Sequence, residues 1–207
     1  MTSFTRSALV ALAAGVFGAS AGAQAAPTQQ GSSTAWTIDP NHTSAHFAVR
    51  HMLVSTVRGD FDKVSGTIQW DGKDVRSISA QVTIDAASVD THVERRDDDL
   101  RSANFFDVAK YPTITFVSTK AEPGEAGHFN LTGNLTMHGV TREVVLDVEG
   151  PMPPISQGAM RRTGVSATTK IDRRDFGLLY NRVVEGAAVV GDEITITIDL
   201  EAVRRGG

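Results

Sequence analysis

The sequence predicts an all-β fold made of antiparallel strands. Apolar and polar residues alternate with a period of two over many short segments, and only one stretch breaks this alternation. Turn-forming pairs separate the segments: Asp71-Gly72, Pro123-Gly124, His138-Gly139 and Gly191-Asp192. A sheet with one apolar face must pack on a second sheet or close on itself, and the periodicity alone does not decide between these two.

The first 25 residues have the features of a secretory signal peptide. Arg6 is their only charge, the apolar run from Ala8 to Ser20 is too short to cross a bilayer, and Ala23-Gln24-Ala25 fits a signal peptidase site. We expect cleavage after Ala25 and a mature protein in the periplasm with no stable membrane span. A retained N-terminal membrane anchor is the alternative.

The rest of the chain is expected to be a linker and one domain. Residues 26–34 are a polar linker, and residues 35–207 are long enough for a single domain with a sizeable core. Eight or nine strands are predicted in chain order, at residues 36–39, 44–50, 64–70, 78–85, 113–119, 129–137, 144–149, 163–171 and 194–201. The clearest is 129–137, where apolar residues alternate with Asn and Thr, as expected for a half-buried strand.

The stretch from Val93 to Val108 lacks the alternation, and we predict a short helix there. Its aspartates Asp97, Asp98 and Asp99 suit a first helical turn, where the positive end of the helix dipole lies. The acidic and basic side chains of this stretch are expected to form a solvated, self-paired surface rather than a catalytic acid/base pair.

Composition argues against several function classes. The net charge is −4 and basic residues are scattered among acids, so nucleic acid is not an expected partner. Without cysteine there are no disulfides and no thiol chemistry. His42 and His46 would share a strand face if both lie in the strand, but His51 would face away, and no His-Glu-x-x-His helix occurs, so we expect no metal site.

Enzymatic motifs are not found either. The sequence has no nucleophile elbow, phosphate-binding glycine loop or dinucleotide fingerprint, so we expect a protein that is not an enzyme and has no catalytic residues. Two alternatives stay open. One is an enzyme that acts on an apolar substrate, and the other is a structural or stress-related interaction protein with an incidental cavity.

Four blocks of sequence, in order, resemble the YceI family of exported lipid-binding proteins. They are Ser44-Ala45-His46-Phe47-Ala48-Val49-Arg50-His51-Met52 with Thr56-Val57-Arg58-Gly59-Asp60-Phe61; Arg96-Asp97 with Leu100-Arg101-Ser102 and Asn104-Phe105-Phe106-Asp107-Val108; Leu135-Thr136-Met137-His138-Gly139-Val140-Thr141; and Asp172-Arg173-Arg174-Asp175-Phe176-Gly177-Leu178 with Val190-Gly191-Asp192-Glu193. Any one block alone would be weak evidence. Together they span nearly all of the expected domain.

The resemblance implies an eight-stranded, antiparallel, lipocalin-like barrel with one or two short helices. Its interior would hold a polyisoprenoid, an isoprenoid quinone or a fatty amide, with no other cofactor, and a homodimer is one alternative for its assembly. The candidate lipid-binding residues are Phe47, Val49, Phe61, Ile84, Phe105, Phe106, Phe116, Leu131, Leu135, Leu146 and Phe176. Each could also simply fill core. Phe105 and Phe106 are favoured, because adjacent rings outside a strand can close a barrel end and touch a ligand.

Overall fold

The computed structural model describes residues 34–125, 127–181, 183–184 and 187–206. The expected signal peptide and all but the last residue of the expected linker lie outside the described residues. Within that part of the chain, no helix has the length and hydropathy needed to cross a membrane.

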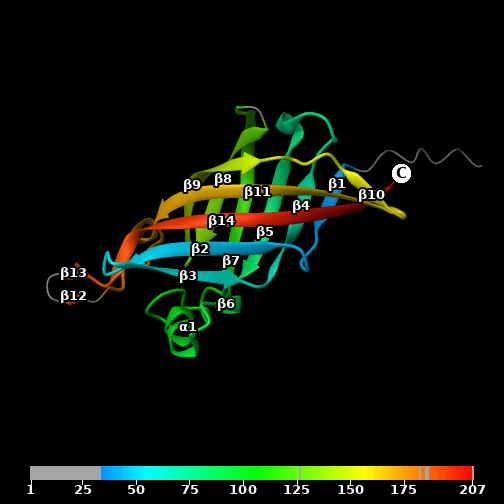
Figure 1. Cartoon of the computed structure of the whole chain (residues 1–207). Coiled ribbons are helices and arrows are strands. Elements are labelled where there is room, and N and C mark those ends of the chain that lie inside the picture. Colours follow the sequence, from blue (N-terminus) through cyan, green and yellow to red (C-terminus); the bar gives the residue numbers. More distant parts are fainter. Residues whose placement is uncertain (1–33, 126, 182, 185–186, 207) are drawn as a thin grey trace, which may run out of the picture. The chain divides into compact units, whose positions relative to one another are not determined.

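The described elements are mostly strands (Figure 1). The strands are β1 (Ala35–Ile38), β2 (Ser44–His51), β3 (Ser55–Phe61), β4 (Val64–Gln69), β5 (Ser79–Asp85), β6 (Val89–Asp90), β7 (Thr113–Pro123), β8 (His128–Met137), β9 (Val140–Glu149), β10 (Ile155–Gln157), β11 (Met160–Asp172), β12 (Val183–Val184), β13 (Ala187–Ala188) and β14 (Val190–Arg205). The helices are α1 (Glu94–Arg101) and the short 3-10 segments η1 (Val75–Ser77), η2 (Ala86–Ser88) and η3 (Arg173–Phe176).

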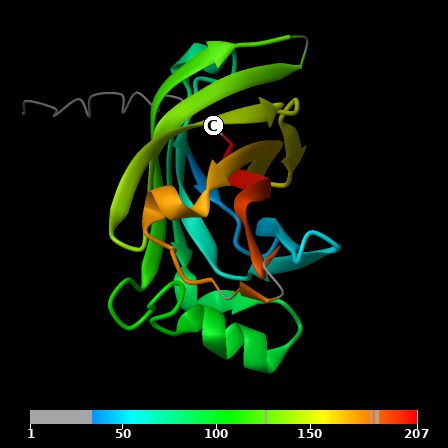
Figure 2. The same ribbon diagram turned by 90° about the vertical axis from the view of Figure 1, so that its left-hand side faces the viewer.

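Eight of these strands form a closed antiparallel ring in the order β1, β4, β5, β7, β8, β9, β11 and β14. The ring closes because β14 pairs with β11 along one edge and with β1 on the other. This confirms the predicted lipocalin-like barrel and decides against two stacked sheets. Figure 2 shows the strands curving around an interior, with α1 at the lower end.

The 16-residue β14 also carries the β2–β3 hairpin. Its residues 190–199 pair with β2, on the same edge that pairs with β1 near residue 202. β3 pairs in turn with β2 and, at Asp60 and Phe61, with the short β6 next to α1. The hairpin therefore extends the barrel wall toward the helix.

Local sequence explains the β8–β9 hairpin. Inward residues of β8, such as Phe129, Leu131 and Leu135, are buried, while the asparagines between them are exposed. The predicted turn at His138 and Gly139 joins the strands with two residues at positive φ, 51° and 75°, the geometry that suits a two-residue hairpin. Here the sequence pattern and the turn chemistry specify the same structure.

Two predictions about strands were wrong. Gly191 and Asp192 do not end a strand; they lie inside β14, where the pairing with β2 is irregular between Val190 and Ile194. Glycine and aspartate are tolerated at such a bulge as well as in a turn. Strand β3 was missed, because its Ser-Thr-Val-Arg-Gly-Asp-Phe sequence mixes charges and glycine with its apolar residues.

The predicted helix exists but is shorter than expected, since it ends at Arg101 and the chain continues to β7 as a loop. The expectation of a solvated acidic surface was wrong for Asp97. Its side chain is 5% exposed and accepts hydrogen bonds from the backbone N–H and the hydroxyl of Thr91. Arg101 donates to the carbonyls of Ala87 and Val89, so these charged residues attach the helix to the barrel.

Candidate functional site

The inward side chains leave a cavity of about 210 Å³ inside the barrel. Every strand of the closed ring contributes to its lining, which consists mainly of aliphatic and aromatic side chains. A single water needs about 10–15 Å³ of such space, so the cavity is large enough for an extended apolar group.

Small residues at inward positions explain why the interior is not filled. Ala45, Ala80, Ala167 and Ala202 are buried and all face the cavity. A branched or aromatic side chain at these positions would occupy the axis of an eight-stranded barrel, whose interior is only wide enough for side chains or one small ligand. The placement of small residues on four strands therefore creates the space.

Ten of the eleven candidate residues line this cavity. They are Phe47, Val49, Phe61, Ile84, Phe105, Phe106, Phe116, Leu131, Leu135 and Leu146. Phe176 is the exception: it belongs to η3, is 1% exposed and lies outside the cavity lining. The alternation of the strands placed most of these residues correctly, whereas Phe176 lies in a 3-10 turn to which strand alternation does not apply. Contact of the ten residues with a ligand stays a prediction.

Aromatic rings cover one end of the cavity. Phe61 contacts Phe47 and Phe106, with ring centroids 5.9 and 5.5 Å apart, and Phe105 contacts Tyr180 at 5.3 Å. Phe105 and Phe106 belong to the loop after α1, and Tyr180 to the loop after η3. This cover therefore combines two rings of the paired strands β2 and β3 with rings of two loops.

Arg173 holds the second of these loops and was not among the candidate residues. Its side chain is 4% exposed. The guanidinium donates to the carbonyls of Gly191, Leu178 and Tyr180 and to the carboxylate of Asp192. Because the planar guanidinium has five N–H donors, one side chain can order a whole loop in this way. A charged residue is normally expected on the surface, and only the fold shows that these carbonyls converge on it.

The opposite end of the cavity is formed by two tryptophans. The rings of Trp36 and Trp70 lie 5.9 Å apart, and both line the cavity. The guanidinium carbon of Arg204 lies 4.5 Å from the centroid of the Trp36 ring. Burial lowers the pKa of Arg204, and the nearby charge of Arg161 lowers it further. Packed rings thus end the cavity on this side.

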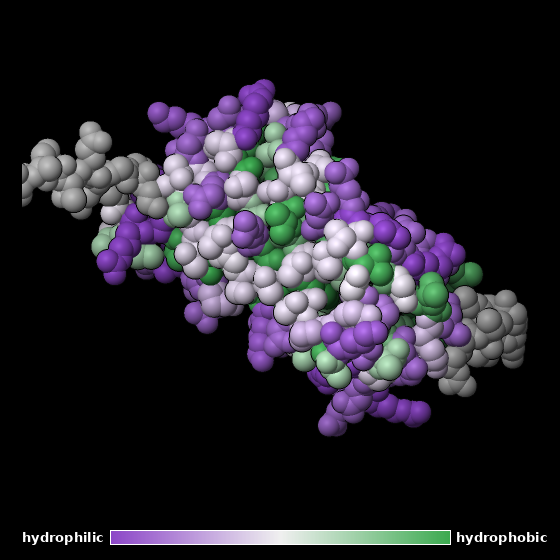
Figure 3. All heavy atoms as spheres, turned by 180° about the vertical axis from the view of Figure 1, so that it is seen from behind, coloured by the Kyte–Doolittle hydropathy of each residue, from purple (hydrophilic) through white to green (hydrophobic). Residues whose placement is uncertain are grey.

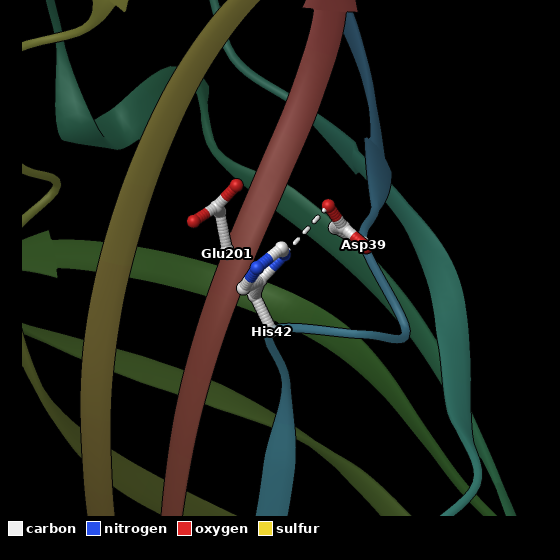
Figure 4. Close-up of side chains that lie close together, drawn as sticks. All are labelled: Asp39, His42 and Glu201. Carbon is white, nitrogen blue, oxygen red and sulfur yellow. Dashed lines mark hydrogen bonds and ion pairs between the residues drawn. The ribbon is translucent and has the colours of Figure 1, made fainter.

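One group of side chains has the composition of a cation site. Potential ligand atoms of Asp39, His42 and Glu201 all lie within 4.8 Å of one another (Figure 4). Arg162 forms ion pairs with both carboxylates, so the group already contains a cation. Hydrogen bonds from His42, from the backbone of Asn41 and from Arg162 hold the pKa of Asp39 at about 2. We interpret the group as an ion-pair network that joins β11, β14 and the turn that follows β1. The absence of a metal site stays an expectation.

The remaining histidines also have structural contacts. His42 precedes β2, so the condition for a strand face shared with His46 is not met. His46 contacts Asp60 through Nδ1 and Ser44 through Nε2, on the half-exposed side of the strand. His138 lies in a turn, as predicted, and its ring contacts that of Tyr111 at 4.7 Å.

Comparisons with known proteins agree with this architecture. Residues 36–202 match the family model described as YceI-like domain. A UPF0312 protein of Staphylococcus aureus is 31% identical over 172 residues, which are 81% of this chain and 96% of that protein.

Solved structures give the same result. The Campylobacter jejuni YCEI protein is 31% identical with a TM-score of 0.66, over 76% of this chain and 90% of that one. A polyisoprenoid binding domain from Saccharophagus degradans is 19% identical with a TM-score of 0.61, over 81% and 97%. At that identity the second comparison shows a shared fold.

Proposed function

We propose, from the premise that this chain belongs to the YceI-like domain family, that it is an exported, periplasmic protein that binds one long apolar lipid inside its barrel. The cavity with its apolar lining is the observation that carries the proposal. A polyisoprenoid is the ligand class we favour, and an isoprenoid quinone or fatty amide has the same slender shape. A structural neighbour described as a polyisoprenoid binding domain supports that choice.

The energetics of such a complex are reasonable. Burial of a CH₂ group contributes roughly 0.8 kcal/mol, so about ten such groups would supply the roughly 8 kcal/mol of a micromolar complex. The entropy lost when the ligand is ordered must be subtracted from this gain. Affinity would therefore follow the length of the chain, while polar groups near the covered end would select the headgroup.

A series of isoprenoid alcohols of increasing length tests this proposal. We expect affinity to rise with each added unit until the chain fills the cavity, and then to level off. Saturated alcohols of equal length should bind with similar affinity if the affinity depends on the shape and apolar area of the ligand. Affinity that is independent of chain length would contradict the proposal, and turnover of a bound alcohol would favour the alternative of an enzyme.

A further inference from the structure

The tip of the β2–β3 hairpin exposes two large apolar side chains. Leu53 is 72% and Val54 is 81% exposed to solvent, in the turn that joins β2 to β3. A single exposed aliphatic residue needs no explanation. Leu53 and Val54 are adjacent at the end of a projecting hairpin, so together they form a small exposed apolar patch.

The backbone of this tip is held in an unfavourable conformation. Met52 and Leu53 both have positive φ, at 49° and 60°, where glycine or asparagine is preferred over bulky residues. Arg50 stabilises the turn by donating to the carbonyl of Leu53 at 2.5 Å and to the hydroxyl of Thr56 at 3.1 Å. The N–H of Met52 also donates to the carbonyl of Val189 at 2.9 Å. The tip is thus fixed in a shape that presents apolar side chains.

The hairpin segment itself carries charges of one sign, and the carboxylates of Asp192 and Glu193 on the neighbouring β14 form ion pairs with Arg173 and Lys170. Between Phe47 and Gly59 the ionisable residues are Arg50, Arg58 and His51, and this segment contains no carboxylate. Both arginines are exposed. Exposed apolar side chains next to basic ones are the combination that binds an anionic lipid surface. The apolar side chains insert into the surface, and the basic side chains are attracted to the anionic headgroups.

The tip lies at the covered end of the cavity. His51 pairs with Val190, and Val190 and Val49 both line the cavity. Tyr180, which contacts Phe105 of the aromatic cover, is 37% exposed, and its neighbour Leu179 is 68% exposed. In Figure 1 the hairpin tip and the η3–β12 loop reach the same end of the barrel, and in Figure 3 apolar atoms come to the surface there.

We propose that Leu53 and Val54, together with Leu179 and Tyr180, dock on the surface of an anionic phospholipid bilayer. The loops that cover the cavity would then face the membrane, so an apolar ligand could pass between bilayer and barrel without crossing water. This inference rests on the proposed lipid-binding function, and it adds the surface through which the ligand is exchanged.

Vesicle flotation tests the docking surface. Wild-type protein should float with vesicles of phosphatidylglycerol and phosphatidylcholine, and more weakly with phosphatidylcholine alone. Leu53→Asn and Val54→Ser should each weaken binding roughly tenfold, the effect of keeping one aliphatic side chain out of an apolar phase. Ile155→Asn is the matched control, because Ile155 is 66% exposed on β10 at the opposite end. Equal flotation of all four proteins would overturn the proposal.

Folding stability separates docking from structure. Asparagine tolerates positive φ better than leucine does, so Leu53→Asn should leave the thermal midpoint unchanged or raise it while vesicle binding falls. Val54→Ser gives a second, independent measurement at a turn position that does not have positive φ. If both variants lose stability and vesicle binding only in proportion to the unfolded fraction, the tip is structural and the proposal is wrong.

The role of the hairpin arginines is tested by charge removal. Arg58→Gln should weaken binding to anionic vesicles roughly fivefold, with little effect on neutral ones, whereas Arg76→Gln, on η1, should change neither. Raising the salt concentration should reduce the difference between wild type and Arg58→Gln. A difference that is the same on neutral vesicles would contradict the electrostatic part of the proposal.

Binding of a dispersed isoprenoid alcohol, measured without vesicles, separates membrane docking from the proposed lipid-binding function. Leu53→Asn should bind the dispersed alcohol like wild type but take it up more slowly from vesicles. If wild type floats with vesicles but never binds the alcohol, the lipid-binding function fails while docking stands. If wild type binds the alcohol but self-associates through this tip and ignores vesicles, docking is overturned.

Discussion

Phe106 shows how one residue can serve both the fold and the site. Its ring lies 5.5 Å from that of Phe61 and lines the cavity. We expect Phe106→Ala to weaken lipid affinity at least tenfold in the protein that remains folded, because it removes apolar contact with the chain. The change should also lower the free energy of unfolding by about 3 kcal/mol, the low end of the range for Phe→Ala, because Phe106 is only partly buried.

Affinity and stability must therefore be measured together, by lipid titration and urea unfolding. Val145→Ala, a change of an exposed apolar residue on the outer wall, is the control. If Phe106→Ala is destabilised yet binds lipid as wild type does, the ring only anchors the loop and its place in the binding site is wrong.

Arg173 is the residue on which the loop after η3 depends. Arg173→Gln would leave the carbonyls of Leu178, Tyr180 and Gly191 without their donor, so we expect a loss of about 3 kcal/mol in the free energy of unfolding. Hydrogen exchange at the loop amides should increase. Arg174→Gln, on the exposed side of η3, should have a much smaller effect, and equal effects of the two changes would refute this role.

Asp39 should make stability depend on pH. Its pKa of about 2 in the folded protein is below the ordinary value of 3.8, so its ion pairs stabilise the fold above pH 3.8, and this contribution is lost as the pH falls through about 2. Asp39→Asn should be less stable at pH 7 and should lose less stability between pH 5 and pH 2. Urea unfolding at both pH values checks this, and parallel pH profiles would contradict it.

At the scale of the element, Gly133 determines how β7 and β8 pack. A Cβ atom there would lie 2.4 Å from the ring of Phe116 and 2.7 Å from the carbonyl oxygen of Val117. Gly133→Ala should therefore cost about 1–3 kcal/mol and lower the thermal midpoint. Gly164→Ala in β11 is the control, since the nearest atom to its Cβ would be 3.5 Å away. Similar midpoints for both variants would show that the ring moves freely.

The same elements show what could be predicted from sequence. Alternation identified β8, β9 and β14 and placed Leu131, Leu135 and Leu146 toward the interior, because a strand fixes the direction of every second side chain. It missed β3. There Gly59 occupies a buried position against the ring of Phe47, but a glycine has no side chain to mark that position as apolar in the sequence. It also could not reveal Arg173, whose partners come from separate segments of the chain.

At the scale of the molecule, a barrel with an unfilled apolar interior lacks the side-chain contacts, and the stability that comes with them, of a fully packed core. A ligand that binds only the folded state stabilises it by mass action, by about 2.7 kcal/mol at a concentration 100 times its dissociation constant. The closed ring of strands keeps its shape around the space, while loops cover one end. Binding and stability are therefore expected to be coupled in this protein.

The central claim, that the barrel encloses a long apolar lipid, is tested most directly by native mass spectrometry of protein purified from the periplasm. The account predicts a complex one lipid heavier than the mature chain that starts after Ala25, and release of a slender apolar molecule on denaturation. Protein that carries no lipid, and gains none when isoprenoid alcohols are offered, would contradict it.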